Sequence, residues 1–90
     1  HTLMASRYFK FDFFDAVSKL SSITKHIHLA DAIGYDQEGV KLGQGELDVV
    51  RFKKMIDDQI PNVSLICETW QGHVNFGQGF LEDLAFYQAL

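Results

Sequence analysis

The stretch "HIHLADAIGYDQEGVKLGQGELD" (residues 26–48) places two histidines two positions apart in a strand-like run and then opens into a glycine-studded segment. Alternate side chains of a strand face opposite ways, so His26 and His28 share one face while Ile27 and Leu29 share the other. A strand that only filled a core would need no imidazoles, and a plain connection would need fewer glycines. The stretch therefore predicts a strand that ends at a functional loop, with the loop over 32–47.

Apolar residues at helical spacing flank this stretch on both sides. Asp12 and Asp48 are suited to cap the helices that follow them, and Pro61 ends the second of these helices. The expected elements are helices over 13–20, 49–60 and about 80–89, and strands over about 25–31 and 63–68. Strands that alternate with helices are typical of βαβ units, so we expect an α/β fold with parallel strands.

Length and composition limit the possible functions. The 90 residues suffice for one small domain, and nearly half of them (47%) are apolar, as in folded proteins. The net charge is −4 and no basic stripe is visible, which argues against a nucleic-acid partner. No apolar run is long enough to span a membrane, so no membrane partner is expected. A single cysteine, Cys67, fits a reducing, cytoplasmic compartment.

Two polar side chains close the two expected strands. His28 belongs to one face of the first strand, and Glu68 shares a face of the second with Ser64 and Ile66. Because the carboxyl ends of parallel strands meet at one edge, His28 and Glu68 can project into one site. Imidazole nitrogen and carboxylate oxygen are usual ligands of divalent transition metals. The alternative is structural: a hydrogen-bonded interior histidine, and a glutamate paired with a neighbouring Lys or Arg.

The motifs "KHIHLADAIGYDQEGVKLGQGELD" (25–48) and "ETWQGH" (68–73) resemble the xylose-isomerase-like (β/α)8 barrels. That superfamily includes sugar isomerases and epimerases and the apurinic-site endonucleases, and the branch found beside sialic-acid-type synthases is most similar. The resemblance covers nearly all of residues 1–90 but only about three βα units of such a barrel. It implies a partial barrel domain, the C-terminal segment of a longer TIM barrel. Residue 1 is histidine rather than methionine, so we also expect a fragment or a processed chain.

The resemblance implies a divalent metal ion (Mn, Mg, Zn or Co) at the mouth of the barrel. His28 and Glu68 correspond to metal ligands of the family, and Glu68 corresponds to the proton-transferring base of its epimerases. His1 is either a further ligand, the histidine of an Asp-x-x-His motif, or a residue foreign to the natural chain. The endonucleases carry an Asp-x-His where this sequence has residues 37–39, "QEG", so a one-metal sugar site fits better.

Loop residues are candidates for holding the remainder of the substrate. Lys41 is either a ligand for a carboxylate or phosphate or a solvated lysine, and Gln71 and His73 follow the Glu68 strand at the barrel mouth. Asp31 either orients His28 or caps the loop by accepting hydrogen bonds from backbone amides.

The resemblance implies a metal-dependent isomerase or epimerase of a sugar or sugar phosphate, with a link to nonulosonic (sialic-type) acid synthesis. Such an enzyme moves a proton next to a metal-chelated carbonyl. The alternative is a non-catalytic barrel module that assembles with a synthase; an endonuclease-like phosphodiesterase fits less well. Two strands cannot close a barrel, so either the missing barrel half or self-association is expected.

Overall fold

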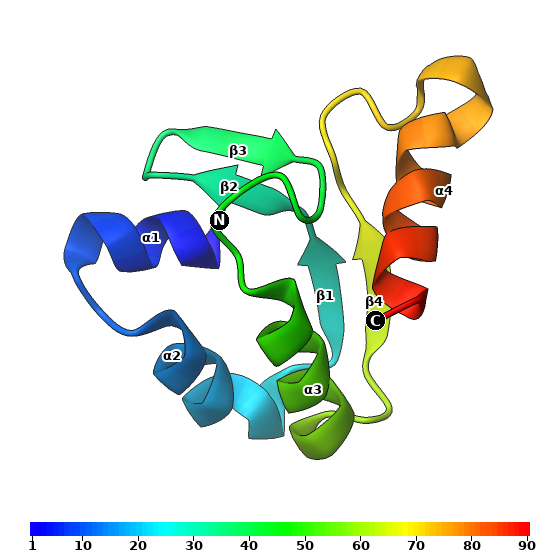
Figure 1. The fold of residues 1–90 in the computed structure, drawn as a ribbon. Coiled ribbons are helices and arrows are strands. Elements are labelled where there is room, and N and C mark those ends of the chain that lie inside the picture. Colours follow the sequence, from blue (N-terminus) through cyan, green and yellow to red (C-terminus); the bar gives the residue numbers. More distant parts are fainter.

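A parallel pair of strands stands at the centre of the molecule (Figure 1). The structure is a computed structural model that describes residues 1–90. It is a small α/β domain with four α-helices and two separate two-stranded sheets. In chain order the elements are α1 (Thr2–Phe9), α2 (Phe13–Leu20), a 3-10 turn (Ser21–Ile23), β1 (His26–Leu29), β2 (Asp31–Ile33), β3 (Gln37–Val40), α3 (Val49–Gln59), β4 (Ser64–Cys67) and α4 (Val74–Gln88).

Strands β1 and β4 pair in parallel, as the alternation of strands and helices predicts. His28 lies opposite Ile66 and Leu29 opposite Cys67, so the two strands end at the same edge. The two faces of this sheet differ strongly: Leu29 is buried, whereas His28 and Ile66 on the other face are exposed. Helices therefore cover only the apolar face, and the face that carries the histidines is open.

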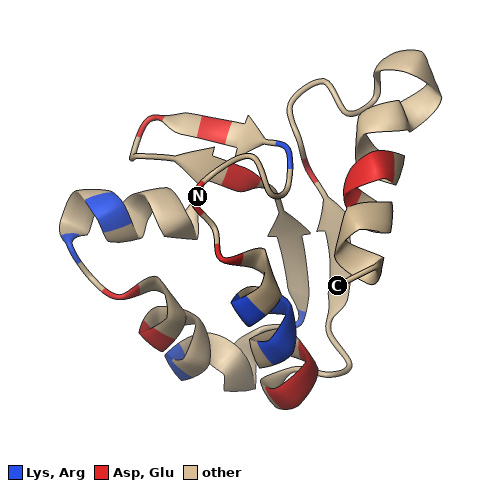
Figure 2. Ribbon diagram, viewed as in Figure 1, with Lys and Arg blue, Asp and Glu red and all other residues tan.

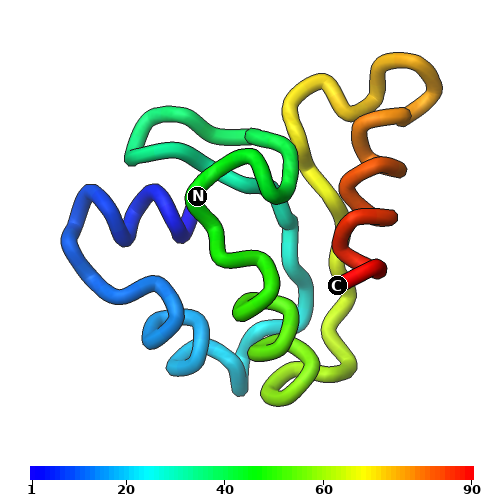
Figure 3. The backbone as a smooth tube through the Cα atoms, in the orientation of Figure 1, coloured from blue at the N-terminus to red at the C-terminus, as the bar shows by residue number.

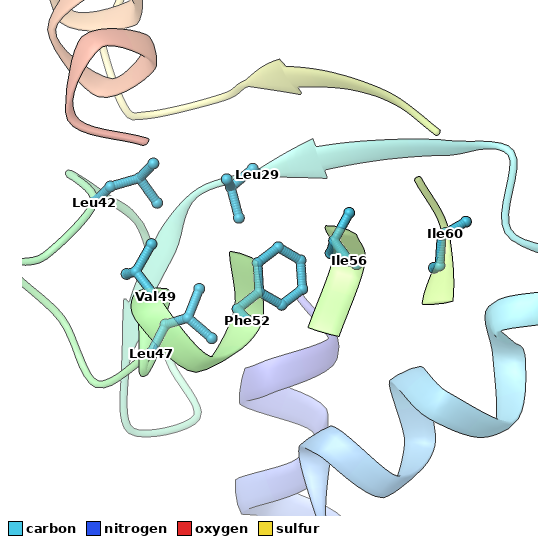
Figure 4. Close-up of a cluster of buried hydrophobic side chains, with 7 residues drawn as sticks. All are labelled: Leu29, Leu42, Leu47, Val49, Phe52, Ile56 and Ile60. Carbon is cyan, nitrogen blue, oxygen red and sulfur yellow. The ribbon is translucent and has the colours of Figure 1, made fainter. Parts of the chain in front are cut away.

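The core forms between the apolar face of the sheet and α3 (Figure 4). Helix α3 begins where expected because the Asp48 carboxylate accepts a hydrogen bond from the Arg51 amide (3.0 Å). Its apolar residues recur at helical spacing and turn one stripe toward the sheet. The buried cluster comprises Leu29, Leu42, Leu47, Val49, Phe52, Ile56 and Ile60. Packing of this stripe fixes the direction of β1 and hence the position of His28.

The segment expected to be a loop over 32–47 contains an antiparallel hairpin of β2 and β3. Asp31 pairs with Val40 and Ile33 with Gln37. Gly34 starts the turn at φ 61°, in the left-handed region that glycine enters without steric cost. The segment forms a hairpin although few of its residues are apolar, because backbone hydrogen bonds between β2 and β3 and the turn at Gly34 stabilise it. The hairpin brings a further set of side chains to the carboxyl end of β1.

The termini differ from expectation in different ways. Helix α1 (Thr2–Phe9) was not anticipated, while α2 begins at Phe13 after the predicted cap, Asp12, whose carboxylate accepts from the Asp15 amide (2.7 Å). The last helix begins earlier than expected, at Val74, with left-handed backbone at Asn75, Phe76 and Gly77. The regular part of α4 follows these residues and packs against β4.

The predicted α/β class with parallel strands is confirmed. The chain holds two successive strand-to-helix units, β1 to α3 and β4 to α4, preceded by two helices. Acidic and basic residues are interspersed along the ribbon without a basic stripe (Figure 2). None of the helices combines the length and apolarity that crossing a membrane requires.

Candidate functional site

The structure brings His28 and Glu68 together at the carboxyl end of the parallel sheet. His28 Nδ1 lies 3.3 Å from Glu68 Oε1, and both side chains are about half exposed (51% and 52%). The Glu68 amide donates to the Leu29 carbonyl (2.8 Å), which extends the β1–β4 ladder to the residue that carries the carboxylate. Register therefore positions this pair, as the sequence predicts.

A second imidazole supports the same face one layer below. His26 Nδ1 lies 2.6 Å from Ser64 Oγ, across the strand pair. The rings of His26 and His28 meet edge to face with centroids 4.9 Å apart. His26 is exposed rather than packed in an interior, because no element covers this face of the sheet. His26 and Ser64 thus extend the row of polar groups on the face that carries His28.

A cavity of about 340 Å³ opens above this pair. Gln71 and His73, for which the resemblance predicts a place at the substrate site, line the cavity together with the exposed indole of Trp70. Gln71 has φ 54°, a left-handed conformation that costs a non-glycine residue about 1 kcal/mol or more. The loop after β4 thus contains one strained backbone position among the residues that line the cavity.

Two further groups of the cavity come from elsewhere in the fold. His1 and Glu38 both line it and form an ion pair through His1 Nε2 and Glu38 Oε2. Sequence reasoning gave His1 a role only by resemblance and assigned none to Glu38, which lies in the unexpected hairpin. The alternation of Gln37 and Gly39 with Glu38 and Val40 is the weak strand signal that could have revealed its orientation.

Hydrogen bonds connect the hairpin to the loop that follows Glu68. The Gly39 carbonyl accepts hydrogen bonds from the Trp70 amide (2.7 Å) and from the buried Thr69 hydroxyl (3.1 Å). Figure 3 shows the backbone of the hairpin end beside the chain that leaves β4. Gly39 has φ 69°, and a Cβ at this position would lie 3.2 Å from the Trp70 nitrogen. Only glycine fits this close backbone approach without strain.

Asp31 caps the loop and does not orient His28. It is 1% exposed, and each of its two carboxylate oxygens accepts two backbone amides. The donors are the amides of Ala32 (2.9 Å), Gly43 (3.1 Å), Gly45 (3.0 Å) and Leu47 (2.8 Å). Of the two roles that the sequence left open, the structure shows the second, because no lone pair is left to reach the histidine.

Lys41 does not line this cavity, so its predicted substrate contact gains no support from the cavity. Its ammonium group pairs with Glu82 on α4, which in turn accepts from Gln78 (2.8 Å). The side-chain hydrogen bond to Glu82 raises the pKa of Lys41, and the same bond lowers the pKa of Glu82. The lysine joins the end of the hairpin to the last helix.

The donor set for a metal is incomplete within these residues. His28 and Glu68 supply one nitrogen and one oxygen of the kind that divalent ions bind. Catalytic metal sites usually take three protein ligands, and no group of three or more His, Cys, Asp or Glu side chains is placed to hold an ion. His1 is turned to Glu38 instead of joining the other two. The chemistry of the donors fits a metal, but their number does not.

Comparison of the chain with family models, with curated proteins and with solved structures gave no match. The geometry of the cavity therefore carries the functional interpretation.

Proposed function

We propose that this chain forms the C-terminal part of a xylose-isomerase-like (β/α)8 barrel and contributes to an isomerase or epimerase of a sugar or sugar phosphate. The observation that carries the proposal is the 3.3 Å contact between His28 and Glu68 at the carboxyl end of two parallel strands. Active sites of such barrels lie at this end. The polar lining of the cavity, with Gln71 and His73, suits a ligand rich in hydroxyl groups.

Proton transfer is the chemistry that these residues support. The Glu68 carboxylate takes a proton from the carbon next to the substrate carbonyl, and His28 lies beside that carboxylate, 3.3 Å away. Gln71 and His73 donate to or accept from neighbouring hydroxyl groups. A divalent ion held by His28 and Glu68, with donors from the missing part of the barrel, would supply Lewis-acid stabilisation of the negative charge that develops on the carbonyl oxygen.

Further strands are part of the proposal, since this chain offers only two metal donors and one parallel strand pair. Parallel sheets in α/β proteins are usually covered on both faces, whereas the face with His28 is exposed here. Strands from the rest of a barrel, or from a second copy, would cover this face and supply the missing donors.

Metal binding tests the proposal directly. Calorimetric titration of the natural protein with Mn²⁺ is expected to show one site, and His28→Ala and Glu68→Gln are each expected to weaken it at least tenfold. Glu82→Gln is the matched control, because this exposed glutamate on α4 makes the same chemical change outside the cavity. Equal affinity in all four proteins would refute a metal role for His28 and Glu68.

The competing function is a non-catalytic barrel module that assembles with a synthase. The observation that favours it is the absence of a three-donor group. This alternative predicts no Mn²⁺ binding by the natural protein and no exchange of sugar protons with solvent.

A further inference from the structure

A second cavity adjoins the one above His28 and Glu68. Its volume is about 530 Å³, and it is lined by the hairpin and by the start of the loop after β4. The residues that line both cavities are Glu38, Gly39, Thr69 and Trp70. Ligand cavities usually measure about 300–1,000 Å³, so each of the two is large enough for one unit of a ligand. The proposed function leaves the second cavity without a role.

Trp70 stands at the boundary between the two cavities. Its backbone amide donates to the Gly39 carbonyl (2.7 Å), which fixes the place from which the indole projects. The hairpin can approach the tryptophan this closely because residue 39 is glycine: a Cβ there would lie 3.3 Å from the Trp70 Cβ. The residue is 78% exposed. It therefore offers a flat apolar surface with one N–H donor to a ligand that extends from one cavity into the other.

The remaining lining of the second cavity is mainly polar. Asp36, Gln37 and Gln44 contribute exposed side chains that make no hydrogen bond within the protein. Their donors and acceptors are therefore free for a ligand. Amide and carboxylate groups beside an indole suit a sugar ring, because the C–H groups of its face stack on the aromatic surface while its hydroxyl groups form hydrogen bonds.

The charges around the second cavity disfavour an anionic ligand. Asp36 has no ion-pair partner, and the only basic residue of the lining, Lys41, is paired with Glu82. Glu38 adds a second carboxylate, which is paired with His1. The surplus charge is negative and repels phosphate and carboxylate groups. The unit of a ligand that fits this cavity is therefore uncharged.

We propose that the second cavity is a saccharide subsite and that the substrate is an uncharged disaccharide or longer sugar chain. Its reducing sugar occupies the cavity above His28 and Glu68, and the next sugar ring stacks on Trp70. The bond between the two rings passes beside Gly39, where the lining has no side chain. This inference rests on the proposed function and narrows its substrate class to unphosphorylated sugars that carry a second ring.

NMR of the natural protein tests the subsite through the indole Nε1–H resonance of Trp70, which Trp70→Phe identifies by its loss. The probes are cellobiose, maltose and lactose, with glucose as the single-ring reference. At least one disaccharide is expected to shift this resonance and to bind at least about tenfold more tightly than glucose. Trp70→Ala is expected to remove that advantage and to leave the affinity for glucose within about twofold of the wild type.

Two further variants control this measurement. Phe76→Ala removes another exposed aromatic side chain, one that lines neither cavity, and is expected to bind all probes as the wild type does. Gln37→Ala leaves the indole in place and is expected to weaken disaccharide binding about threefold or more without changing the affinity for glucose. Circular dichroism establishes that each variant is folded.

One probe tests the charge of the ligand. UDP-glucose can stack its base on the indole but brings two phosphates to Asp36 and Glu38. It is expected to leave the Trp70 resonance unchanged at concentrations at which the disaccharide saturates the protein. A shift with UDP-glucose would overturn the assignment of an uncharged substrate.

Deuterium exchange in D₂O with Mn²⁺ separates this inference from the proposed function. Exchange next to the carbonyl carbon of glucose, with no disaccharide advantage or with one that Trp70→Ala retains, would overturn the subsite and leave the proposed function intact. Disaccharide binding that depends on Trp70, without exchange of any sugar proton, would overturn the proposed function and leave a saccharide-binding cavity. Neither binding nor exchange would overturn both.

Discussion

Replacing Asp31 by asparagine is expected to destabilise the protein severely. The buried carboxylate accepts four backbone amides, two on each oxygen. The asparagine NH₂ group would replace one oxygen and face two N–H donors, which then lose their acceptor. A hydrogen bond to a charged group contributes about 1.5–3 kcal/mol, so losing two costs about 3–6 kcal/mol. Small domains have a free energy of unfolding of only about 5–15 kcal/mol.

Urea unfolding followed by circular dichroism measures this loss. The free energy of unfolding of a small domain falls by about 1 kcal/mol per molar urea. The urea concentration at the midpoint of unfolding should therefore fall by about 3 M or more, or the variant should be unfolded without urea. Asp36→Asn is the matched control, since this exposed aspartate in the hairpin turn accepts no hydrogen bond in the structure. A free energy of unfolding within about 1 kcal/mol of the wild type would refute the assignment of Asp31 as the loop cap.

Three further changes test the remaining structure. In urea titrations, Gly39→Ala is expected to lower the free energy of unfolding by about 1–2 kcal/mol more than Gly34→Ala does. Both glycines have positive φ, but only Gly39 lies against the backbone of Trp70. Burial raises the pKa of Asp83, whose Oδ2 has no hydrogen-bond partner, so ionisation of this carboxyl destabilises the fold as pH rises above 3.8. Asp83→Asn is therefore expected to raise the free energy of unfolding by about 1 kcal/mol at pH 7, and thermal melts should show this difference from the wild type vanish near pH 3. Phe52→Ala in the core should lower the free energy of unfolding, measured in urea, by about 3–5 kcal/mol. The control Leu81→Ala, at an exposed leucine, should change it by no more than about 0.5 kcal/mol.

The elements that periodicity describes could be predicted from the sequence. Apolar residues at helical spacing after Asp12 and Asp48 marked two helices, and alternation marked β1 and β4. The hairpin could not be found this way, because Gly34 and Gly39 serve backbone conformation and contact rather than an apolar pattern. Helix α1 was missed for a related reason: it begins without a capping side chain, and His1 precedes it.

For the site, strand register was enough to bring His28 and Glu68 together, since parallel strands align their ends. Contacts between segments far apart in sequence were beyond such reasoning. The partner of Lys41 is 41 residues away on α4, and the amides that occupy Asp31 lie up to 16 residues away. The sequence identifies these residues as polar, but only the tertiary fold determines which of them meet the cavity.

The uncovered face of the β1–β4 sheet connects stability with chemistry. Ile66 lies on this face beneath the Glu68 carboxylate and is 48% exposed, although it occupies a central position in its strand. Covering it with further structure would remove apolar area from water and stabilise the assembly by about 1 kcal/mol for this side chain alone. The same cover would exclude water from His28 and Glu68. An ion pair or a developing enediolate is stabilised more strongly at lower dielectric constant, so the surface that completes the fold would also strengthen the acid–base chemistry of the cavity.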